Sequence, residues 1–288
     1  MMHRVLRTTC ISANSPYHLL IRRFSSRSPS SSITPAEAGR LAESIALKDI
    51  SQRHLQNESI ATCLAHSGMT SQTINAAMAP PIHFSTTYSR PANGQYNDTD
   101  SIYSRADNPT RLLLERVMFE LETHNCSKFN DEYPSLISES SESPSSYAFS
   151  SGMMAVSSIL MAHKSPAIAL LPLDVYHGVP TVAVDVFRRF NIKVDRVDMT
   201  QVSNVRDFIA KMNYSSSSNH VDATEQPQII VWIETPSNPL CQVIDIREVC
   251  GTVQSLSSSY KGSITTVVDS TLSPPVLTQP LHVSIESQ

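Results

Sequence analysis

Two acidic residues follow apolar runs in the second half of the chain, at points where a carboxylate could meet a ligand. Glu234 comes directly after residues 229–233, and Asp269 comes directly after residues 264–268. In a parallel sheet, ligands bind beyond the carboxyl ends of the strands. A carboxylate held there could pair with a protonated ring nitrogen and keep that ring electron-withdrawing. For Asp269 taken alone, capping a turn or a helix is the more common role.

A candidate anion site lies at residues 150–154 (Ser-Ser-Gly-Met-Met), which precede apolar residues at helical spacing. The backbone N–H groups of Gly152 and Met153 would point outward at the start of that helix. Free N–H groups at a helix start attract anions such as phosphate. For this motif alone, an ordinary serine N-cap without a ligand is the alternative.

Tyr176 is a third candidate, because it lies between a predicted strand and a predicted helix, in residues 174–178 (Asp-Val-Tyr-His-Gly). A tyrosine at such a place can stack flat on a ligand ring, or it can simply fill the core. The residue type alone favours the core.

The composition excludes several classes of function. None of the seven glycines lies in a G-x-G-x-x-G or G-x-x-x-x-G-K pattern, so the common nucleotide-binding loops are absent. The five cysteines contain no C-x-x-C pair, which indicates neither a zinc site nor a disulfide framework, and we expect no metal. The sequence has no stretch of eighteen apolar residues, so we expect no membrane span.

The amino-terminal residues have the composition of an organelle transit peptide. Residues 1–32 contain five arginines, eight serines and no acidic residue. We expect residues 1–33 to direct the protein to mitochondria, with a plastid address or a basic tail on a cytoplasmic protein as alternatives. The rest of the chain has 17 basic against 26 acidic residues, which disfavours nucleic acid as a partner.

The remaining chain divides into two predicted parts. Residues 34–110 form an amino-terminal segment, with a helix over 35–56 and an extended arm over 79–110 that is rich in Pro, Ser, Thr and Asn. Residues 111–288 form the main domain, which begins with a helix over 111–122. A surface insertion rich in serine and acid interrupts this domain at residues 125–146.

From Tyr147 onward, helical and strand patterns alternate along the chain. The expected helices span residues 152–163, 178–190, 201–213 and 245–259, and the expected strands span residues 167–171, 192–197, 228–233 and 264–268. This alternation predicts an α/β fold in which helices cover a mostly parallel sheet.

Several motifs, in this order and at about this spacing, resemble the family of cystathionine gamma-synthases, gamma-lyases and beta-lyases. These enzymes of Cys/Met metabolism depend on pyridoxal 5'-phosphate (PLP). The motifs are residues 80–88 (PPIHFSTTY), 103–105 (YSR), 108–111 (NPTR), 151–153 (SGM), 174–178 (DVYHG), 234–239 (ETPSNP), 268–271 (VDST), 273–274 (SP) and 279–281 (QPL). The resemblance covers residues 60–281 approximately, and so many ordered matches rarely arise by chance.

The resemblance implies a role for each of eight residues. The backbone amides of Gly152 and Met153 would bind the PLP phosphate, and Tyr176 would stack on the pyridine ring. Asp269 would pair with the ring nitrogen, and Asn238 and Thr271 would make supporting contacts. Tyr103 and Arg105 would reach the phosphate of a neighbouring subunit's cofactor, because a planar guanidinium suits that task.

The resemblance also implies a fold and an assembly. The fold would be the large domain of the aspartate aminotransferase type, in a chain that lacks the family's small carboxyl-terminal domain. The shared cofactor site implies a homodimer or a homotetramer. The expected partner is a small amino-acid substrate.

Three departures from the family pattern bear on activity. His177 stands where the family usually has a second glycine, and Ser270 stands where it usually has asparagine. The family's Schiff-base lysine follows the segment that matches residues 279–281, and the sequence here ends at Gln288 without one. We therefore expect no catalytic residue of that kind within these 288 residues.

The resemblance thus implies a PLP-dependent transsulfuration enzyme, a carbon–sulfur lyase or transferase, that is inactive in this form. Its substrates would be cystathionine, homocysteine or cysteine-related amino acids. The alternative is a noncatalytic PLP-fold protein that acts as a partner or regulatory subunit of a complete relative.

Overall fold

The computed structural model describes residues 8–11, 18–21, 59–66, 79–89, 102–106, 108–124, 146–218, 226–275 and 277–285. The chain divides into two compact units. The larger combines Met1–Arg22 with Ser145–Gln288, and the smaller is Arg23–Pro144. The predicted helix over 35–56 lies outside the described residues, and so does the predicted insertion, except for its last residue.

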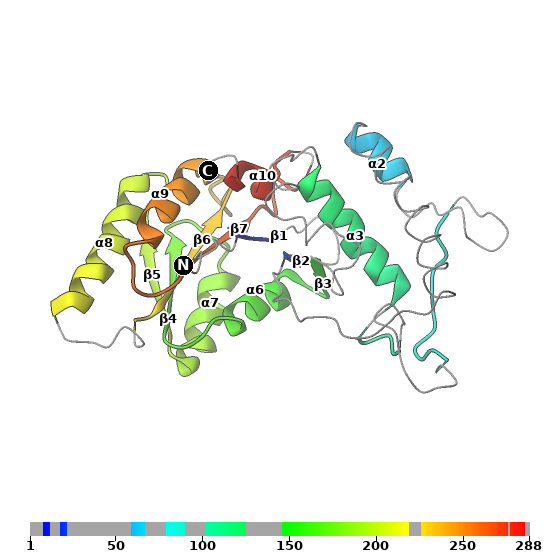
Figure 1. The fold of residues 1–288 in the computed structure, drawn as a ribbon, viewed down its shortest axis with the longest axis horizontal. Coiled ribbons are helices and arrows are strands. Elements are labelled where there is room, and N and C mark those ends of the chain that lie inside the picture. The colour runs from blue at the N-terminus through cyan, green and yellow to red at the C-terminus, as the bar shows by residue number, and fades with distance from the viewer. Residues whose placement is uncertain are drawn as a thin grey trace, which may run out of the picture. The chain divides into compact units, whose positions relative to one another are not determined.

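A five-stranded parallel sheet forms the centre of the larger unit (Figure 1). In spatial order its strands are β1 (Thr8–Ile11), β7 (Ile264–Asp269), β6 (Gln228–Glu234), β4 (Ala167–Pro172) and β5 (Ile192–Val197). A separate antiparallel pair joins β2 (His18–Ile21) to β3 (Ser146–Phe149). Strands β1 and β2 come from the residues that the sequence predicts to be a transit peptide, so in the structure this segment adds strands to both sheets.

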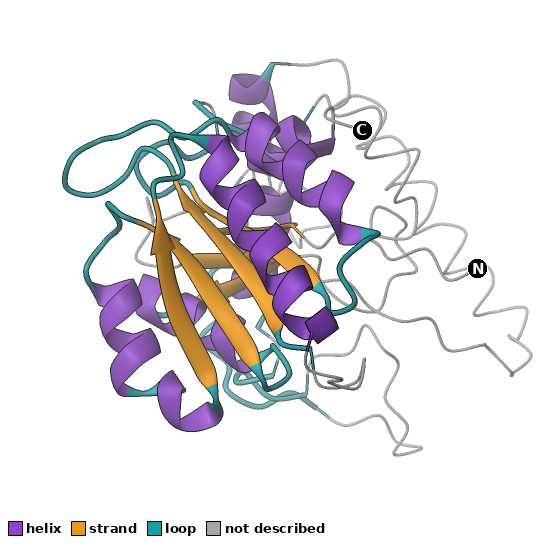
Figure 2. Ribbon diagram, turned by 90° about the vertical axis from the view of Figure 1, so that its left-hand side faces the viewer, coloured by secondary structure: helices purple, strands orange, loops and turns teal. Residues whose placement is uncertain are grey.

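Helices cover both faces of the five-stranded sheet, as Figure 2 shows. One face carries α6 (Gly152–Met161), α7 (Gly178–Asp185) and the short 3₁₀ helix η2 (Phe187–Phe190). The other carries α8 (Val202–Ser218) and α9 (Ile246–Ser257). The last helix, α10 (Pro280–Ile285), contacts α9 and β1. The predicted α/β class with a mostly parallel sheet is confirmed.

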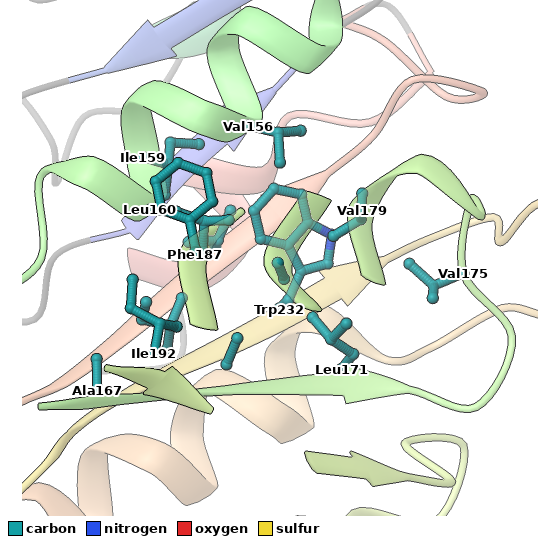
Figure 3. Packing of buried hydrophobic residues seen from close by; sticks show 14 of the residues in the cluster. Val156, Ile159, Leu160, Ala167, Leu171, Val175, Val179, Phe187, Ile192 and Trp232 are labelled. Carbon is teal, nitrogen blue, oxygen red and sulfur yellow. The ribbon is translucent and has the colours of Figure 1, made fainter. Parts of the chain in front are cut away.

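Strand β6 explains why the sheet needs both helical layers. Ile229, Val231 and Ile233 point into the core beneath α8 and α9. Ile230 and Trp232 point into the core beneath α6, α7 and η2. Figure 3 shows Trp232 among its neighbours in this core. Side chains alternate between the faces of a strand, so a strand that is apolar at every position is stable only when both faces are covered.

Most predicted elements of the larger unit match the structure to within a few residues. Strand 192–197 matches β5, and Asp269 and Glu234 are the last residues of their strands. The helix predicted over 178–190 is wrong in one respect, because it is two elements, α7 and η2. The chain leaves α-helical geometry after Asp185, and Asn191, in the left-handed conformation at φ 59°, ends η2 just before β5.

In the smaller unit, helix α2 (Ile60–His66) contacts α3 (Pro109–Thr123). Asn108 caps α3 by accepting hydrogen bonds from the backbone N–H groups of Thr110 and Arg111. The same side chain donates to the carbonyl of His83 at 3.2 Å, and the Thr110 hydroxyl accepts from the His83 N–H at 2.9 Å. The predicted arm is therefore attached to the start of α3 by side chains rather than by a sheet.

Within the part of the chain that the structure describes, no helix has both the length and the apolar character needed to cross a bilayer.

Trp232 gives a test of the packing on the α6 face. Its indole is fully buried, and its Nε1–H has no acceptor among the described residues. We expect Trp232→Ala to cost about 3–5 kcal/mol of the free energy of unfolding. We expect Trp232→Phe to cost about 2 kcal/mol or less of the same free energy. The smaller ring loses packing volume, but the change also removes a buried donor that has no acceptor among the described residues, which offsets part of the loss.

Urea unfolding followed by far-ultraviolet circular dichroism would measure both variants, since they lack the chain's only tryptophan. A loss in Trp232→Phe as large as that in Trp232→Ala would contradict this expectation, because the phenyl ring fills much of the buried volume that alanine leaves empty.

Candidate functional site

Two buried carboxyl groups lie side by side at the carboxyl edge of the sheet. Glu234 ends β6 and Asp269 ends β7, and the two residues are paired in the register of these neighbouring strands. Glu234 is 3% exposed and Asp269 is 7% exposed. The apolar runs that precede them bring both carboxyl groups to the edge where parallel sheets bind ligands.

Glu234 joins two loops through its carboxylate. Its two oxygens each accept from the backbone N–H of Tyr176 at 3.0 Å, and Oε1 also accepts from the backbone N–H of Asn238 at 2.8 Å. Tyr176 lies in the loop after β4, and Asn238 lies in the loop after β6. One side chain therefore sets the positions of both loops relative to the edge of the sheet.

Asp174 provides a second link between the same two loops. Its Oδ2 accepts a hydrogen bond from the Ser237 hydroxyl and another from the backbone N–H of Leu240, the latter at 3.1 Å. The Ser237 hydroxyl also accepts from the backbone N–H of Gln242 at 2.9 Å. Because these bonds fix the loop after β6 on both sides of Asn238, the loop has little freedom to move away from Tyr176.

Asp269 has fewer partners than its burial would suggest. Its Oδ1 accepts from the backbone N–H of Thr271 at 3.0 Å and from the Thr271 hydroxyl at 2.5 Å. Burial raises the pKa of the Asp269 carboxyl above its usual range, and the two bonds from Thr271 oppose that rise. No hydrogen bond to Oδ2 is present among the described residues, so this oxygen is available to a donor from a ligand.

The environment of Glu234 also disfavours its charged form. Its pKa is raised to about 7: burial is the largest cause and the charges of Asp269 and Asp174 act in the same direction, while the N–H groups of Tyr176 and Asn238 oppose the rise. Within the described part of the chain, the groups that act on the pKa of Glu234 and of Asp269 include no cation. This edge of the sheet is therefore suited to a ligand with a positive group.

Gly178 brings the Tyr176 ring close to the start of α6. A Cβ atom at Gly178 would lie 2.6 Å from Cε1 of Tyr176 and 2.8 Å from Sδ of Met153. The side chains of Tyr176 and Met153 thus meet at the one place where residue 178 has no side chain. The Tyr176 ring is 38% exposed and also contacts the His177 ring, with 4.7 Å between the centroids.

The start of α6 has the free donors that the sequence predicts. Ser151 is the N-cap, and its hydroxyl accepts from the backbone N–H of Met154 at 3.3 Å. The N–H groups of Gly152 and Met153 have no acceptor among the described residues. These two N–H groups, with the positive end of the helix dipole, suit an anion such as phosphate.

The structure brings together three of the features that the sequence predicts. Met153 meets Tyr176 at Gly178, the backbone of Tyr176 binds Glu234, and Glu234 is the strand partner of Asp269. Asn238 and Thr271 belong to the same network through their backbone N–H groups.

Tyr103 and Arg105 lie in the smaller unit, where the Arg105 guanidinium is 5.0 Å from the Tyr103 ring centroid. Their predicted part in a cofactor site stays a prediction.

The sequence did not reveal the parts that Asp174 and Gly178 play. Both stand in the motif that contains Tyr176. The bonds of Asp174 form only when β4 and β6 lie next to each other, and the close approach at Gly178 forms only when α6 packs beside α7. Glu234 was visible as an acid after an apolar strand, whereas its bonds to two loops were not.

Four lysines lie within the described residues. Lys164 and Lys261 precede β4 and β7, Lys193 is near the start of β5, and Lys211 is on α8. All of these positions except the one on α8 are at the amino ends of strands, away from the carboxyl edge. The described residues also contain no cluster of His, Cys, Asp or Glu side chains that could hold a metal ion.

Comparison with known proteins identifies the family. Residues 61–286 match the profile of the Cys/Met metabolism PLP-dependent enzymes. The chain belongs to this family. The resemblance drawn from the sequence motifs is therefore confirmed, together with the family's dependence on PLP.

Curated relatives and solved structures agree with this assignment. A cystathionine gamma-lyase of Bacillus subtilis is 29% identical over 226 residues, which are 78% of this chain and 48% of the relative. A cystathionine beta-lyase of Lactococcus lactis is 28% identical over 79% of this chain and 49% of the relative. A cystathionine gamma synthase structure from Xanthomonas oryzae superposes with a TM-score of 0.58 at 26% identity, covering 78% of this chain and 48% of that one. The chain thus spans about half the length of the relatives it matches.

The residues at the carboxyl edge fit PLP in their chemistry. The free N–H groups of α6 suit the phosphate, and the partly exposed Tyr176 ring offers an aromatic face. The buried carboxyl of Asp269 suits the ring N–H, since a carboxylate without a cation gains most from a charged donor.

Gly178 allows the close approach of Tyr176 and Met153 to be tested separately from the fold. We expect Gly178→Ala to push the Tyr176 ring and the Met153 side chain apart, and to weaken PLP binding roughly tenfold or more, since one misplaced group can cost ~1.4 kcal/mol of binding free energy. The free energy of unfolding should change by about 1 kcal/mol or less, because alanine is the better helix former. Titration with PLP and thermal unfolding would measure the two effects, with Gly251→Ala in α9, where a Cβ meets nothing within 4 Å, as the control. Unchanged PLP affinity in Gly178→Ala would contradict a role of this close approach in binding PLP.

Proposed function

We propose that this chain forms the cofactor-binding part of a PLP-dependent transsulfuration enzyme of sulfur amino-acid metabolism. One observation carries the proposal: hydrogen bonds and strand register connect Tyr176, Glu234 and Asp269 at one edge of the sheet, beside the free N–H groups of α6. The named relatives support the class of reaction, since they are a cystathionine gamma-lyase, a cystathionine beta-lyase and a cystathionine gamma synthase.

Each residue at this edge has a task that follows from its surroundings. Gly152 and Met153 would hold the phosphate through their N–H groups, and the Tyr176 ring would stack on the pyridine ring of PLP. Asp269 would accept a hydrogen bond from the protonated ring nitrogen and keep the proton there, while Thr271 orients the carboxylate through Oδ1. The bound cofactor then supplies an electron sink for bonds at the substrate carbon next to its amine.

The substrate would be a small amino acid such as cystathionine, homocysteine or a cysteine relative. The Xanthomonas oryzae synthase, whose crystal structure is a complex with aminoacrylate and cysteine, supports this class. Tyr103 and Arg105 would complete the phosphate site of a neighbouring copy, so the working assembly would be a homodimer or a homotetramer.

A second function is favoured by the positions of the lysines. Because no lysine among the described residues lies at the carboxyl edge, these residues would bind PLP without attaching it covalently. In that case the chain would be inactive alone and would act as a noncatalytic partner of a complete relative.

Trapping with borohydride separates these two functions. We expect the purified chain to bind PLP, seen as a shift in the absorbance of the cofactor, and to release it on dialysis after borohydride treatment. A stable mass increase of one reduced cofactor, assigned to a lysine by peptide mapping, would instead support the catalytic function.

Asp269→Asn provides the site control for this experiment. We expect it to bind PLP about 10–100-fold more weakly, since a hydrogen bond to a charged group contributes ~1.5–3 kcal/mol. Asp185→Asn, at the end of α7, should bind like the wild type. Equal affinities in Asp269→Asn and the wild type would overturn the proposed site, and so would the absence of any binding by the wild type.

For residues 1–33 we propose a mitochondrial address, with a plastid or cytoplasmic location as the alternative outcomes. The five arginines and the absence of acidic residues support it. We expect residues 1–33 fused to a fluorescent protein to enter mitochondria, and the same fusion with all five arginines changed to glutamine to stay in the cytoplasm. Fluorescence microscopy with a mitochondrial dye measures this, and a cytoplasmic location of the unmodified fusion would contradict it.

A further inference from the structure

Glu234 has no task in binding PLP directly, yet its carboxylate accepts three hydrogen bonds, whereas the Asp269 carboxylate accepts two. Its carboxylate binds the backbone on which Tyr176 stands and the backbone of Asn238, and it lies beside Asp269. The amide oxygen of a glutamine could accept the two bonds that Oε1 accepts. An ionised carboxylate accepts at both oxygens and makes charge-assisted bonds, which strengthens the hold on the backbone of Tyr176.

The charges around Glu234 make its ionisation depend on what Asp269 binds. Among the described residues, the charged groups that act on it are Asp269 from β7 and Asp174 from the loop after β4, and both are acidic. With its pKa raised to about 7, mainly by burial, Glu234 can gain or lose a proton near neutral pH. A cation that pairs with Asp269 would cancel the nearest negative charge and favour the ionised form of Glu234.

We propose that Glu234 is a positioning residue that carries a proton while the site is empty and loses it when a cationic ring nitrogen pairs with Asp269. The loss of the proton turns the bonds from Tyr176 and Asn238 into charge-assisted ones and fixes the stacking tyrosine over the ring. This inference rests on the proposed function. Binding and the ordering of the tyrosine loop are therefore linked through one proton.

The proton has a first consequence in the cofactor-free chain. The folded-state pKa of Glu234 is above its value in the unfolded chain, so the folded state binds more protons than the unfolded state between about pH 4.5 and about pH 7. The free energy of unfolding must therefore fall as the pH rises through that window. We expect Glu234→Gln to lose this component of the pH dependence, and Glu248→Gln, an exposed change in α9, to retain it.

The second consequence concerns affinity. Below pH 7 the wild type must give up a proton to bind PLP, whereas Glu234→Gln has none to give up. The ratio of the wild-type Kd to the Kd of Glu234→Gln should therefore rise as the pH falls from 8 to 6, by up to about tenfold per pH unit for one linked proton. Taking the ratio removes the titration of PLP itself, because both proteins bind the same molecule.

Asp174→Asn tests the same link without changing Glu234. The amide keeps an oxygen for Ser237 and Leu240, but it removes one of the charges that raise the pKa of Glu234. We expect it to move both pH windows to lower pH. This variant also decides the matter if Glu234→Gln does not fold, since Asp174→Asn retains all three bonds of the Glu234 carboxylate.

The experiment measures unfolding by urea and PLP affinity by titration, each from pH 5 to pH 8.5, for the wild type and the three variants. A Kd ratio that is independent of pH would overturn the inference while leaving the proposed PLP site intact. Absence of PLP binding by the wild type at every pH would instead overturn the proposed function, and this inference with it.

Discussion

The carboxyl edge of this sheet depends on a buried acidic side chain that binds backbone N–H groups rather than cations. Glu234 accepts hydrogen bonds from the backbone N–H groups of Tyr176 and Asn238, which lie in two loops that are far apart in the sequence. Burial of a carboxylate is costly unless its oxygens have donors. The hydrogen bonds that offset this cost also fix the backbone of Tyr176 and the loop that contains Asn238. Burial of the Glu234 carboxylate and ordering of the two loops therefore depend on the same bonds.

The sheet makes this arrangement possible through its register. Glu234 and Asp269 are paired because β6 and β7 run in parallel and end at the same level. Each of the two strands is buried on both faces, so a shift that drew Glu234 or Asp269 between the helical layers would bury a carboxyl group without its donors. The apolar residues of β6 and β7 therefore determine the separation of the two carboxyl groups.

The sequence predicted those parts of the fold and site that depend on local pattern. Apolar runs that alternate with helical patterns predicted the parallel sheet. The positions of Glu234 and Asp269 at the ends of two such runs predicted that both carboxyl groups lie at its carboxyl edge. The division of the helix after Asp185 could not be predicted, because residues 178–190 have a helical apolar pattern throughout. The contacts of Gly178 and Asp174 could not be predicted either, since they depend on atoms from neighbouring strands and helices.

The acidic groups at the carboxyl edge also link the stability of the folded chain to the binding of a ligand there. Three acidic groups gather at this edge, and no cation among the described residues acts on the two that are buried, so the empty edge is unfavourable in its fully ionised form. A ligand with one positive nitrogen and one anionic group would relieve this at Asp269 while its anion meets the N–H groups of α6. Any ligand that binds only the folded state stabilises it. A site of this kind therefore gains stability from the same charges that make it selective for a protonated ring with a phosphate.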